Sequence, residues 1–250
     1  DGLVCSLAGC HMGVTAENVA ADFQIDRDDM DAFSEASQKK AARAWGEGRF
    51  EKEVMPVAIP QRRGDPVSFA RDEHIRANTT RDSLAKLGPA FMGEGGTVTA
   101  GNSSGINDGA AAVVVMARSR AERMGLKPLG VIRGFGAAGV PPRVMGIGPI
   151  PATRKALQRA GLEMKDIDLV ELNEAFAAQA LAVGKELKFD WDRVNVNGGA
   201  IAIGHPVGAS GARIAMTLLY EMERRNVRYG LATMCIGGGM GVAMVFERPK

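Results

Sequence analysis

Apolar and polar positions alternate in the second half of the chain in a way that predicts strands and helices in turn. Short apolar runs bounded by Gly, Asn and Asp are typical of buried strands. The strands expected in chain order are Gly130–Val140, Ile167–Leu172, Val194–Val196, Leu231–Met234 and Gly241–Phe246. The helices expected between them are Pro151–Ala160, Glu174–Leu187 and Pro206–Arg225. This alternation predicts an α/β fold, a sheet with helices packed on it and with loops at its strand ends.

The first hundred residues follow a different pattern. Helical periodicity covers Thr15–Phe23 and Arg27–Trp45, and Asp26 with Asp29 three positions later resembles a weak capping box. Between residues 46 and 96 the periodicity weakens, while Pro, Gly and charged residues accumulate. We therefore expect this part to be an excursion domain outside the α/β unit.

A further apolar run, Ala110–Met116, predicts a strand, and the helical piece after it ends near Gly125. The run precedes the regular α/β alternation, so we expect it to belong to a second sheet whose other strands are not found here. The chain opens on Asp1 in an ordinary mid-sequence setting. We therefore expect an upstream segment to be missing.

Composition narrows the class of protein. The 250 residues are 46% hydrophobic and 24% charged, with a formal net charge of +2, so we expect no nucleic-acid partner. The longest apolar runs are too short to cross a bilayer, so no membrane association is expected. The three cysteines and three histidines predict neither a disulfide framework nor a metal site, and a reducing compartment is expected. That compartment is the cytoplasm, or the mitochondrion or peroxisome if the protein is eukaryotic. The three cysteines are Cys5, Cys10 and Cys235, and the three histidines are His11, His74 and His205.

Three segments carry residues suited to chemistry, and each follows an expected strand. They are Asn173-Glu174-Ala175-Phe176, the block from Asn197 to Pro206, and the block from Cys235 to Gly241. If the strands are parallel, all three segments meet at one edge of the sheet.

The chemistry of these segments is complementary. His205 precedes an expected helix, whose positive end disfavours the imidazolium form and leaves a neutral base. Cys235 enters a glycine run whose free N–H groups suit an oxyanion, and its thiolate is a base or nucleophile if its pKa is lowered. Asn173 can orient a water or polarise a carbonyl. Taken singly, each residue also has a plain structural reading, as an inert buried thiol or as a helix cap.

Together the segments resemble the thiolase family. The run from Gly198 to Gly211, Cys235 to Gly241 and Asn173 to Phe176 are similar to three thiolase signatures. Two further stretches resemble the entry to and exit from that family's coenzyme-A-binding loop domain. These are His11 to Asn18 and Gly96 to Gly105.

The resemblance implies a layered α-β-α thiolase fold. Residues 1–106 would form the mostly helical loop domain that binds coenzyme A. Residues 107–127 would be the last strand and helix of an otherwise missing N-terminal half. Residues 128–250 would form the C-terminal half.

The resemblance also implies roles for site residues. His205 would deprotonate a nucleophilic cysteine and help bind the thioester oxygen, and Cys235 would move a proton at the substrate α-carbon. Asn173 would hold the water of one oxyanion hole, and the N–H of Gly237 would serve the other. The residues implied to bind the substrate or coenzyme A are His11, Met12, Arg76, Ser104, Met145 and Phe176. His74 has no implied role and is expected on the surface.

One departure from the family pattern is large. Thiolases carry their acyl-accepting cysteine in a Cys-x-Ser-Gly setting, which this chain lacks. Cys5 and Cys10 have no glycine-rich setting and are expected to pack. Either a segment is missing or a complementary chain is needed.

The activity implied for the intact protein is reversible condensation of two acetyl-CoA to acetoacetyl-CoA and CoA, or thiolytic cleavage of a 3-ketoacyl-CoA. The substrate would be an acyl-CoA, no cofactor would be bound covalently, and a homodimer or tetramer is expected. A ketoacyl-synthase relative is disfavoured, because those enzymes use histidine where Cys235 stands. A non-catalytic relative that binds coenzyme A or lipid stays open because the nucleophile is absent.

Overall fold

The computed structural model describes residues 2–249. Its strands are β1 (Val4–Cys5), β2 (Cys10–His11), β3 (Val57–Ile59), β4 (Val67–Phe69), β5 (Val131–Gly139), β6 (Leu169–Leu172), β7 (Tyr229–Ile236) and β8 (Met240–Glu247). Its α-helices are α1 (Met12–Phe23), α2 (Arg27–Gly46), α3 (Arg81–Ala85), α4 (Arg118–Arg123), α5 (Pro149–Ala160), α6 (Ala177–Leu187), α7 (Ala200–Ile203) and α8 (Ser210–Arg225). Short 3-10 helices are η1 (Pro142–Ile147), η2 (Met164–Asp166) and η3 (Trp191–Arg193).

The central sheet has the strand order β5-β8-β7-β6, which confirms the α/β fold expected for the second half. Strands β6 and β7 are parallel, with Leu172 opposite Thr233. The hairpin of β7 and β8 and the pairing of β8 with β5 are antiparallel. The two parallel strands therefore end at the same edge of the sheet.

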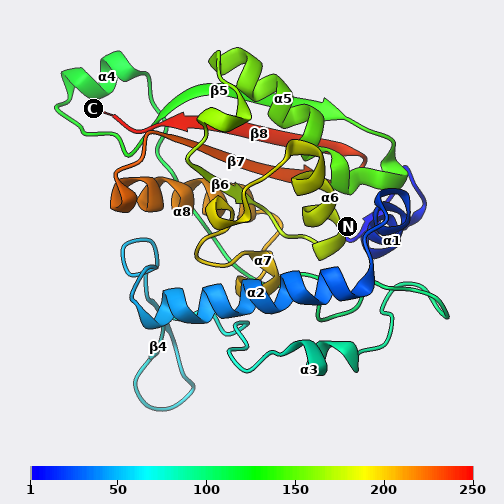
Figure 1. Ribbon diagram of the computed structural model, residues 1–250. Helices are drawn as coiled ribbons and strands as arrows, with labels where there is room; N and C mark the ends of the chain where they lie inside the picture. Colours follow the sequence, from blue (N-terminus) through cyan, green and yellow to red (C-terminus); the bar gives the residue numbers. More distant parts are fainter. Residues whose placement is uncertain (1, 250) are drawn as a thin grey trace.

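Helices cover both faces of this sheet (Figure 1). Side chains of α5 and α6 share one buried cluster with Val170, Leu231 and Val245 of the sheet. On the opposite face α8 packs through Leu218 and Met222. Neighbouring residues along each strand thus point to opposite layers, as the pleat of a strand requires. The result is the α-β-α layering implied by the resemblance.

The first part of the chain lies against this unit through two helices. Helix α1 contacts η1 and α6, while α2 contacts α6 and α7 and runs as the long blue helix along the lower side of Figure 1. The expected cap of α2 is present, because Asp26 Oδ1 accepts the Asp29 N–H at 2.8 Å. The β3–β4 hairpin projects away from the body in Figure 1.

Two expected helix starts are wrong by several residues. Helix α6 begins at Ala177 rather than at Glu174, and Phe176 stands at its N-cap. The backbone just before it is occupied elsewhere, since Ser104 N–H donates to Ala175 O and Ala177 N–H to Asn102 O. Helix α8 begins at Ser210 rather than at Pro206.

Two expected strands are also wrong. Val194–Val196 forms only an isolated bridge, from Val194 to Val170. Ala110–Met116 is not a strand, because within residues 2–249 no strand lies beside it to complete a ladder. Val114 within it is 87% exposed. The helical piece that follows is present as α4, which ends just before Gly125.

Candidate functional site

The sheet edge formed by β6 and β7 brings two of the three signature segments together. Asn173 follows β6 directly, and its N–H donates to Thr233 O of β7 at 3.0 Å. Cys235 stands near the end of the same strand β7. Because the two strands are parallel, Asn173 and Cys235 meet at one edge, as expected.

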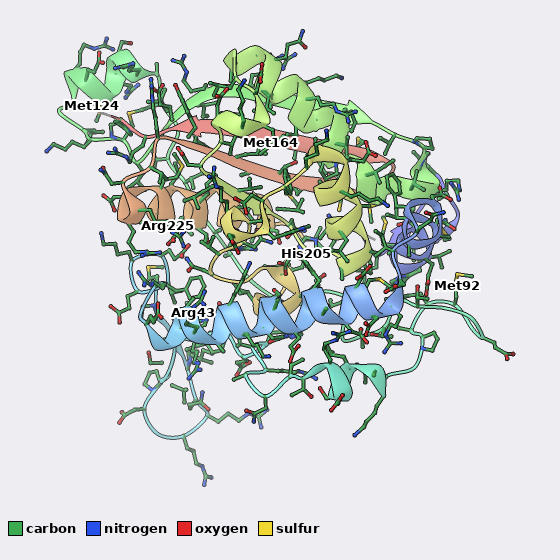
Figure 2. All side chains as sticks on the ribbon, viewed as in Figure 1. Arg43, Met92, Met124, Met164, His205 and Arg225 are labelled. Carbon is green, nitrogen blue, oxygen red and sulfur yellow. The ribbon has the colours of Figure 1, made fainter. Side chains whose placement is uncertain are left out.

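His205 lies in the connection between α7 and α8 and is held from several sides. Its backbone N–H donates to Asn107 Oδ1 at 3.1 Å, and its main chain bridges Ile106. Its ring nitrogen Nε2 is 3.2 Å from Asn173 Nδ2, and Nδ1 is 2.5 Å from Ser210 Oγ. Figure 2 labels His205 inside the molecule, just above α2. The third signature segment therefore reaches the same edge.

The environment of His205 lowers its pKa to about 4, first through burial and then through the positive charge of Arg213. The neutral base expected from the sequence is therefore present, but the cause differs. A helix start was expected directly after His205, whereas α8 begins five residues later. Arg213, from the first turn of α8, supplies the positive charge instead.

A buried carboxyl faces Arg213 on this side of the sheet. Glu171 of β6 is 2% exposed, and its Oε2 lies 3.3 Å from Arg213 Nη1. Burial raises the pKa of Glu171 to about 8, and the positive charge of Arg213 opposes that rise. Arg213 therefore lies between this carboxyl and the ring of His205 and acts on both pKa values.

Cys235 has a contrasting environment. Its side chain is 6% exposed and belongs to a buried cluster with Met12, Met145 and Phe176. Burial raises the pKa of its thiol to about 12. The lowered pKa considered from the sequence is therefore wrong for this structure, and the group rests as a neutral thiol.

Met12, Met145 and Phe176, which were expected to bind the substrate or coenzyme A, are thus brought together around Cys235. His11 lies beside them, because its ring stacks on Phe91 with ring centroids 4.8 Å apart. Phe91 also meets Phe176 edge to face at 5.9 Å. Sequence reasoning missed Phe91, whose segment carries no periodic or motif signal.

The two N-terminal cysteines have different surroundings. Cys5 is buried in the cluster around Cys235, and Ala8 N–H donates to its Sγ at 3.3 Å. Cys10 lies opposite Cys5 in the β1–β2 pair and is half-buried. Packing accounts for Cys5, as expected.

Gly237 follows β7 in the glycine run. Within the described residues its backbone N–H meets no hydrogen-bond acceptor, as an oxyanion donor requires. A Cβ at this position would lie 2.7 Å from Met12 Cε, so the loop fits closely against the pocket wall. Only a residue without a side chain fits this contact without displacing Met12.

The expected coenzyme-A contacts are spread more widely. Ser104 is half-buried, and its N–H donates to Ala175 O at 3.0 Å, which places it next to the Asn173 segment. Arg76 is exposed, and its backbone N–H donates to Gln38 Oε1 of α2. His74 was expected on the surface but is half-buried, and its ring fills the space beside Gly105.

Glu174 is a positioning residue that sequence reasoning missed. Its carboxylate is 1% exposed and accepts from Ser37 Oγ, Asn195 Nδ2 and Ile201 N. Burial raises its pKa. These bonds tie α2 and α7 to the segment that carries Asn173. Within residues 2–249 no group of His, Cys, Asp and Glu side chains is placed to hold a metal ion.

Comparison with known proteins gives this geometry a context. A family model described as the thiolase N-terminal domain matches residues 1–119, and one described as the thiolase C-terminal domain matches residues 126–248. The chain belongs to the thiolase family. Within that family it is 59% identical over 249 residues to acetyl-CoA acetyltransferase of Chromobacterium violaceum, covering 100% of this chain and 63% of the relative. It is 58% identical over 248 residues to the Escherichia coli acetyl-CoA acetyltransferase, covering 99% of this chain and 62% of the relative.

Solved thiolases share the fold. The Bacillus anthracis acetyl-CoA acetyltransferase superposes with a TM-score of 0.96 at 46% identity, over 99% of this chain and 62% of that one. Human mitochondrial 3-ketoacyl-CoA thiolase in complex with CoA superposes with a TM-score of 0.94 at 42% identity, over 99% and 61%. The chain therefore spans a little over three fifths of the length of the thiolases it matches. No helix among residues 2–249 has the length and apolar character needed to cross a membrane.

Proposed function

We propose that this chain is part of an acyltransferase of the thiolase type. The reaction is the reversible Claisen condensation of two acetyl-CoA to acetoacetyl-CoA and CoA. The main support is the neutral imidazole of His205, whose Nε2 lies 3.2 Å from Asn173 beside the strand that carries Cys235. The acetyl-CoA acetyltransferases at 58–59% identity support the choice of substrate.

In the first half-reaction the nucleophile is a cysteine thiol from a Cys-x-Ser-Gly segment, which this chain does not contain. His205 Nε2 takes the thiol proton, and the thiolate attacks the acetyl-CoA carbonyl. The leaving CoA takes the proton of Cys235 and departs as a thiol, which leaves Cys235 as a thiolate. His205 keeps the proton that it took, and an acetyl thioester remains on the cysteine. Covalent transfer divides the condensation into two easier steps.

In the second half-reaction Cys235, as its thiolate, removes a proton from the methyl group of a second acetyl-CoA. The resulting carbanion attacks the acetyl thioester, so a carbon–carbon bond forms and the carbon–sulfur bond to the enzyme breaks. His205 returns a proton to the released thiolate. The N–H of Gly237 and a water held by Asn173 would stabilise the two oxyanions.

The pocket around Cys235 suits a short acyl group. Met12, Met145 and Phe176 pack around Cys235, which is 6% exposed, and this burial supports a short acyl group over a long one. We infer that the pantetheine arm passes Ser104 and His11 and that the nucleotide end reaches the exposed Arg76. The human thiolase structure with CoA supports a coenzyme-A site in this fold.

A non-catalytic protein that binds coenzyme A is the second candidate. One observation favours it, namely that none of the 250 residues forms the Cys-x-Ser-Gly setting of the acyl acceptor. The placement of His205, Asn173 and Cys235 at one sheet edge argues against a binding protein, because these residues suit acyl transfer. A binding protein needs no neutral base at this edge.

The test compares the chain alone with a completed protein. Incubated with acetoacetyl-CoA and CoA, the chain alone should form no acetyl-CoA above background. Joined to the remaining segment of the Escherichia coli relative, it should form acetyl-CoA, and His205→Ala in the same protein should not. A folded fusion that binds CoA but never turns over would favour the binding protein.

We also propose a homo-oligomer for the intact protein, on the family resemblance, and association of the chain alone through one exposed apolar segment. Val113, Val114 and Val115 are 51–87% exposed in a segment without a strand partner, and apolar surface of this kind usually finds another surface. We expect sedimentation of the chain alone to show associated species. A monodisperse monomer with cooperative melting would contradict this expectation.

A further inference from the structure

We propose that Ser210 is a positioning residue that fixes the tautomer of His205, so that Nδ1 carries the hydrogen and Nε2 keeps its lone pair toward the reacting atoms. This role rests on the proposed function of His205 as the base that activates the nucleophile. A neutral imidazole has one donor and one acceptor nitrogen, and the partner of one nitrogen decides the state of the other.

The contacts around the ring form one directed chain of hydrogen bonds. Asn173 Nδ2 donates to Nε2 at 3.2 Å, which requires a lone pair on Nε2. Nδ1 then carries the hydrogen and donates to Ser210 Oγ at 2.5 Å. The Ser210 hydroxyl donates onward to Pro206 O at 3.0 Å. The hydrogen of Asn173 points toward the Nε2 lone pair, and the hydrogens of Nδ1 and of the Ser210 hydroxyl point away from it.

The position of Ser210 suits this role. It is the first residue of α8 and is 1% exposed, so water does not compete for its oxygen. Its bond to the carbonyl four residues earlier limits the rotation of the hydroxyl. With Ser210 in place, Nδ1–H has a buried acceptor. Without it, a buried donor is left without a partner, which is unfavourable.

The reverse chain is the alternative. Asn173 would turn its amide oxygen toward Nε2–H, and Ser210 would donate to Nδ1. Pro206 O would then keep only the backbone N–H groups of Ala209 and Ser210. In that arrangement Nε2 has no free lone pair and cannot accept the thiol proton. The two arrangements differ in which ring nitrogen is protonated, so they can be distinguished directly.

The experiment is 15N magic-angle-spinning NMR of sedimented protein labelled at histidine, which does not depend on molecular size. Only His11, His74 and His205 contribute, and His205→Gln identifies the third set of signals. We expect His205 to show a protonated Nδ1 and an unprotonated Nε2 at pH 7. In Ser210→Ala, signals of the Nε2-protonated tautomer should appear, and Ser210→Thr should restore the original pattern.

Ser34→Ala is the matched control. Ser34 is also a buried serine whose hydroxyl donates to the carbonyl four residues earlier, Met30 O at 2.7 Å, but it has no contact with a histidine. This variant should leave all three histidine spectra unchanged. Unchanged signals of His11 and His74 in Ser210→Ala would show that the fold survives.

A protonated Nε2 in the unmodified chain would overturn the assignment, and so would an unchanged His205 tautomer in Ser210→Ala. Activity is a separate readout. In the completed enzyme Ser210→Ala should slow acyl-enzyme formation by about 10–100-fold, by analogy with the loss of a group that orients a metal-binding histidine. If the tautomer is as expected but His205→Ala leaves turnover intact, the proposed function fails while the role of Ser210 stands.

Discussion

The surroundings of His205 and of Cys235 differ in almost every physical respect, although both lie at one sheet edge. Polar groups surround His205, with Asn173 and Ser210 on its two ring nitrogens and Arg213 nearby. Apolar side chains surround Cys235, chiefly Met12, Met145 and Phe176. One site is built from hydrogen bonds and charge and the other from packing.

Burial nevertheless acts on both groups by the same rule, because it favours whichever form is neutral. For an imidazole the neutral form is the base, and the pKa of His205 falls to about 4. For a thiol the neutral form is the acid, and the pKa of Cys235 rises to about 12. His205 therefore rests ready to take a proton, whereas Cys235 rests ready to give one.

The largest expected effect comes from removing each group in the completed enzyme. His205→Ala should prevent acyl-enzyme formation, because the variant lacks the base that takes the thiol proton. Cys235→Ser should let the acyl-enzyme form but block condensation, because a hydroxyl is a poor base for an α-proton. Losses of a general base typically cost ~10²–10⁴ in rate.

Mass spectrometry after brief exposure to acetyl-CoA separates the two variants. An acetyl adduct on Cys235→Ser but not on His205→Ala is the expected pattern. Adducts on His205→Ala alone would mean that the two roles are exchanged.

Alkylation measures the protected state of Cys235 in the chain as it stands. A thiol with a pKa of about 12 holds roughly 10³-fold fewer thiolates at a given pH than one with an ordinary value, and burial slows access further. Iodoacetamide at mildly alkaline pH should therefore label half-buried Cys10 well before Cys235. Peptide mapping after graded exposure gives the order. Early labelling of Cys235 would show that its pocket opens or that its pKa is lowered.

Arg213→Met should remove the positive charge that lowers the pKa of His205, while the burial of the ring stays in place. The pKa of His205 should rise from about 4, by an amount on the order of one pKa unit, toward its value in the unfolded chain. The unfolded chain takes the proton first, so stability is present above the unfolded pKa and is lost as pH falls toward the folded one. Arg213→Met should lose less stability over this acid window.

Histidine NMR titration and acid melting curves check this result. Arg154→Met on α5 is the control, because Arg154 is exposed and pairs only with Glu186 at the surface. An unchanged titration of His205 in Arg213→Met would show that burial alone sets its pKa.

Gly237→Ala should give the smallest effect and tests how closely the Cys235 side is packed. The added Cβ meets Met12 Cε at 2.7 Å, but that atom ends a flexible side chain. A loss of about 1 kcal/mol in the free energy of unfolding is expected, at the low end for overpacking.

The double variant of Gly237→Ala with Met12→Ala should show coupling between the two positions in a thermodynamic cycle. Gly88→Ala, with open space around its Cβ, should be nearly neutral. Additive effects of the two pocket changes would contradict close packing.

Sequence reasoning was strongest where the determinants are local. The periodicity predicted α1, α2, α5 and most of the central sheet, and Asp26 was identified as the cap of α2 because its partner is three residues away. It failed at residues 173–176, which look like the first turn of a helix. Ala175 O accepts from Ser104 N–H, and Ala177 N–H donates to Asn102 O, about seventy residues earlier. Periodicity carries no information on such distant bonds.

The candidate site shows the same limit. His205, Cys235 and Asn173 could be identified because their motifs are contiguous. The raised pKa of Cys235 could not, because its burial depends on Met12, Met145 and Phe176 from three separate segments. The contributions of Phe91 and Arg213 depend on tertiary contacts in the same way.

The contacts of residues 106–109 with the His205 connection have a consequence for engineering. Ile106 bridges His205, Asn107 Oδ1 accepts its N–H, and Gly109 leaves room for Pro206. These residues directly follow Ser104, so a loop exchanged to alter substrate choice would carry the support of the histidine with it. A transplant that ends at Gly101 leaves this support native. One that runs through Asn107 must bring a side chain that can hold the same N–H, or the new loop will change the rate as well as the substrate.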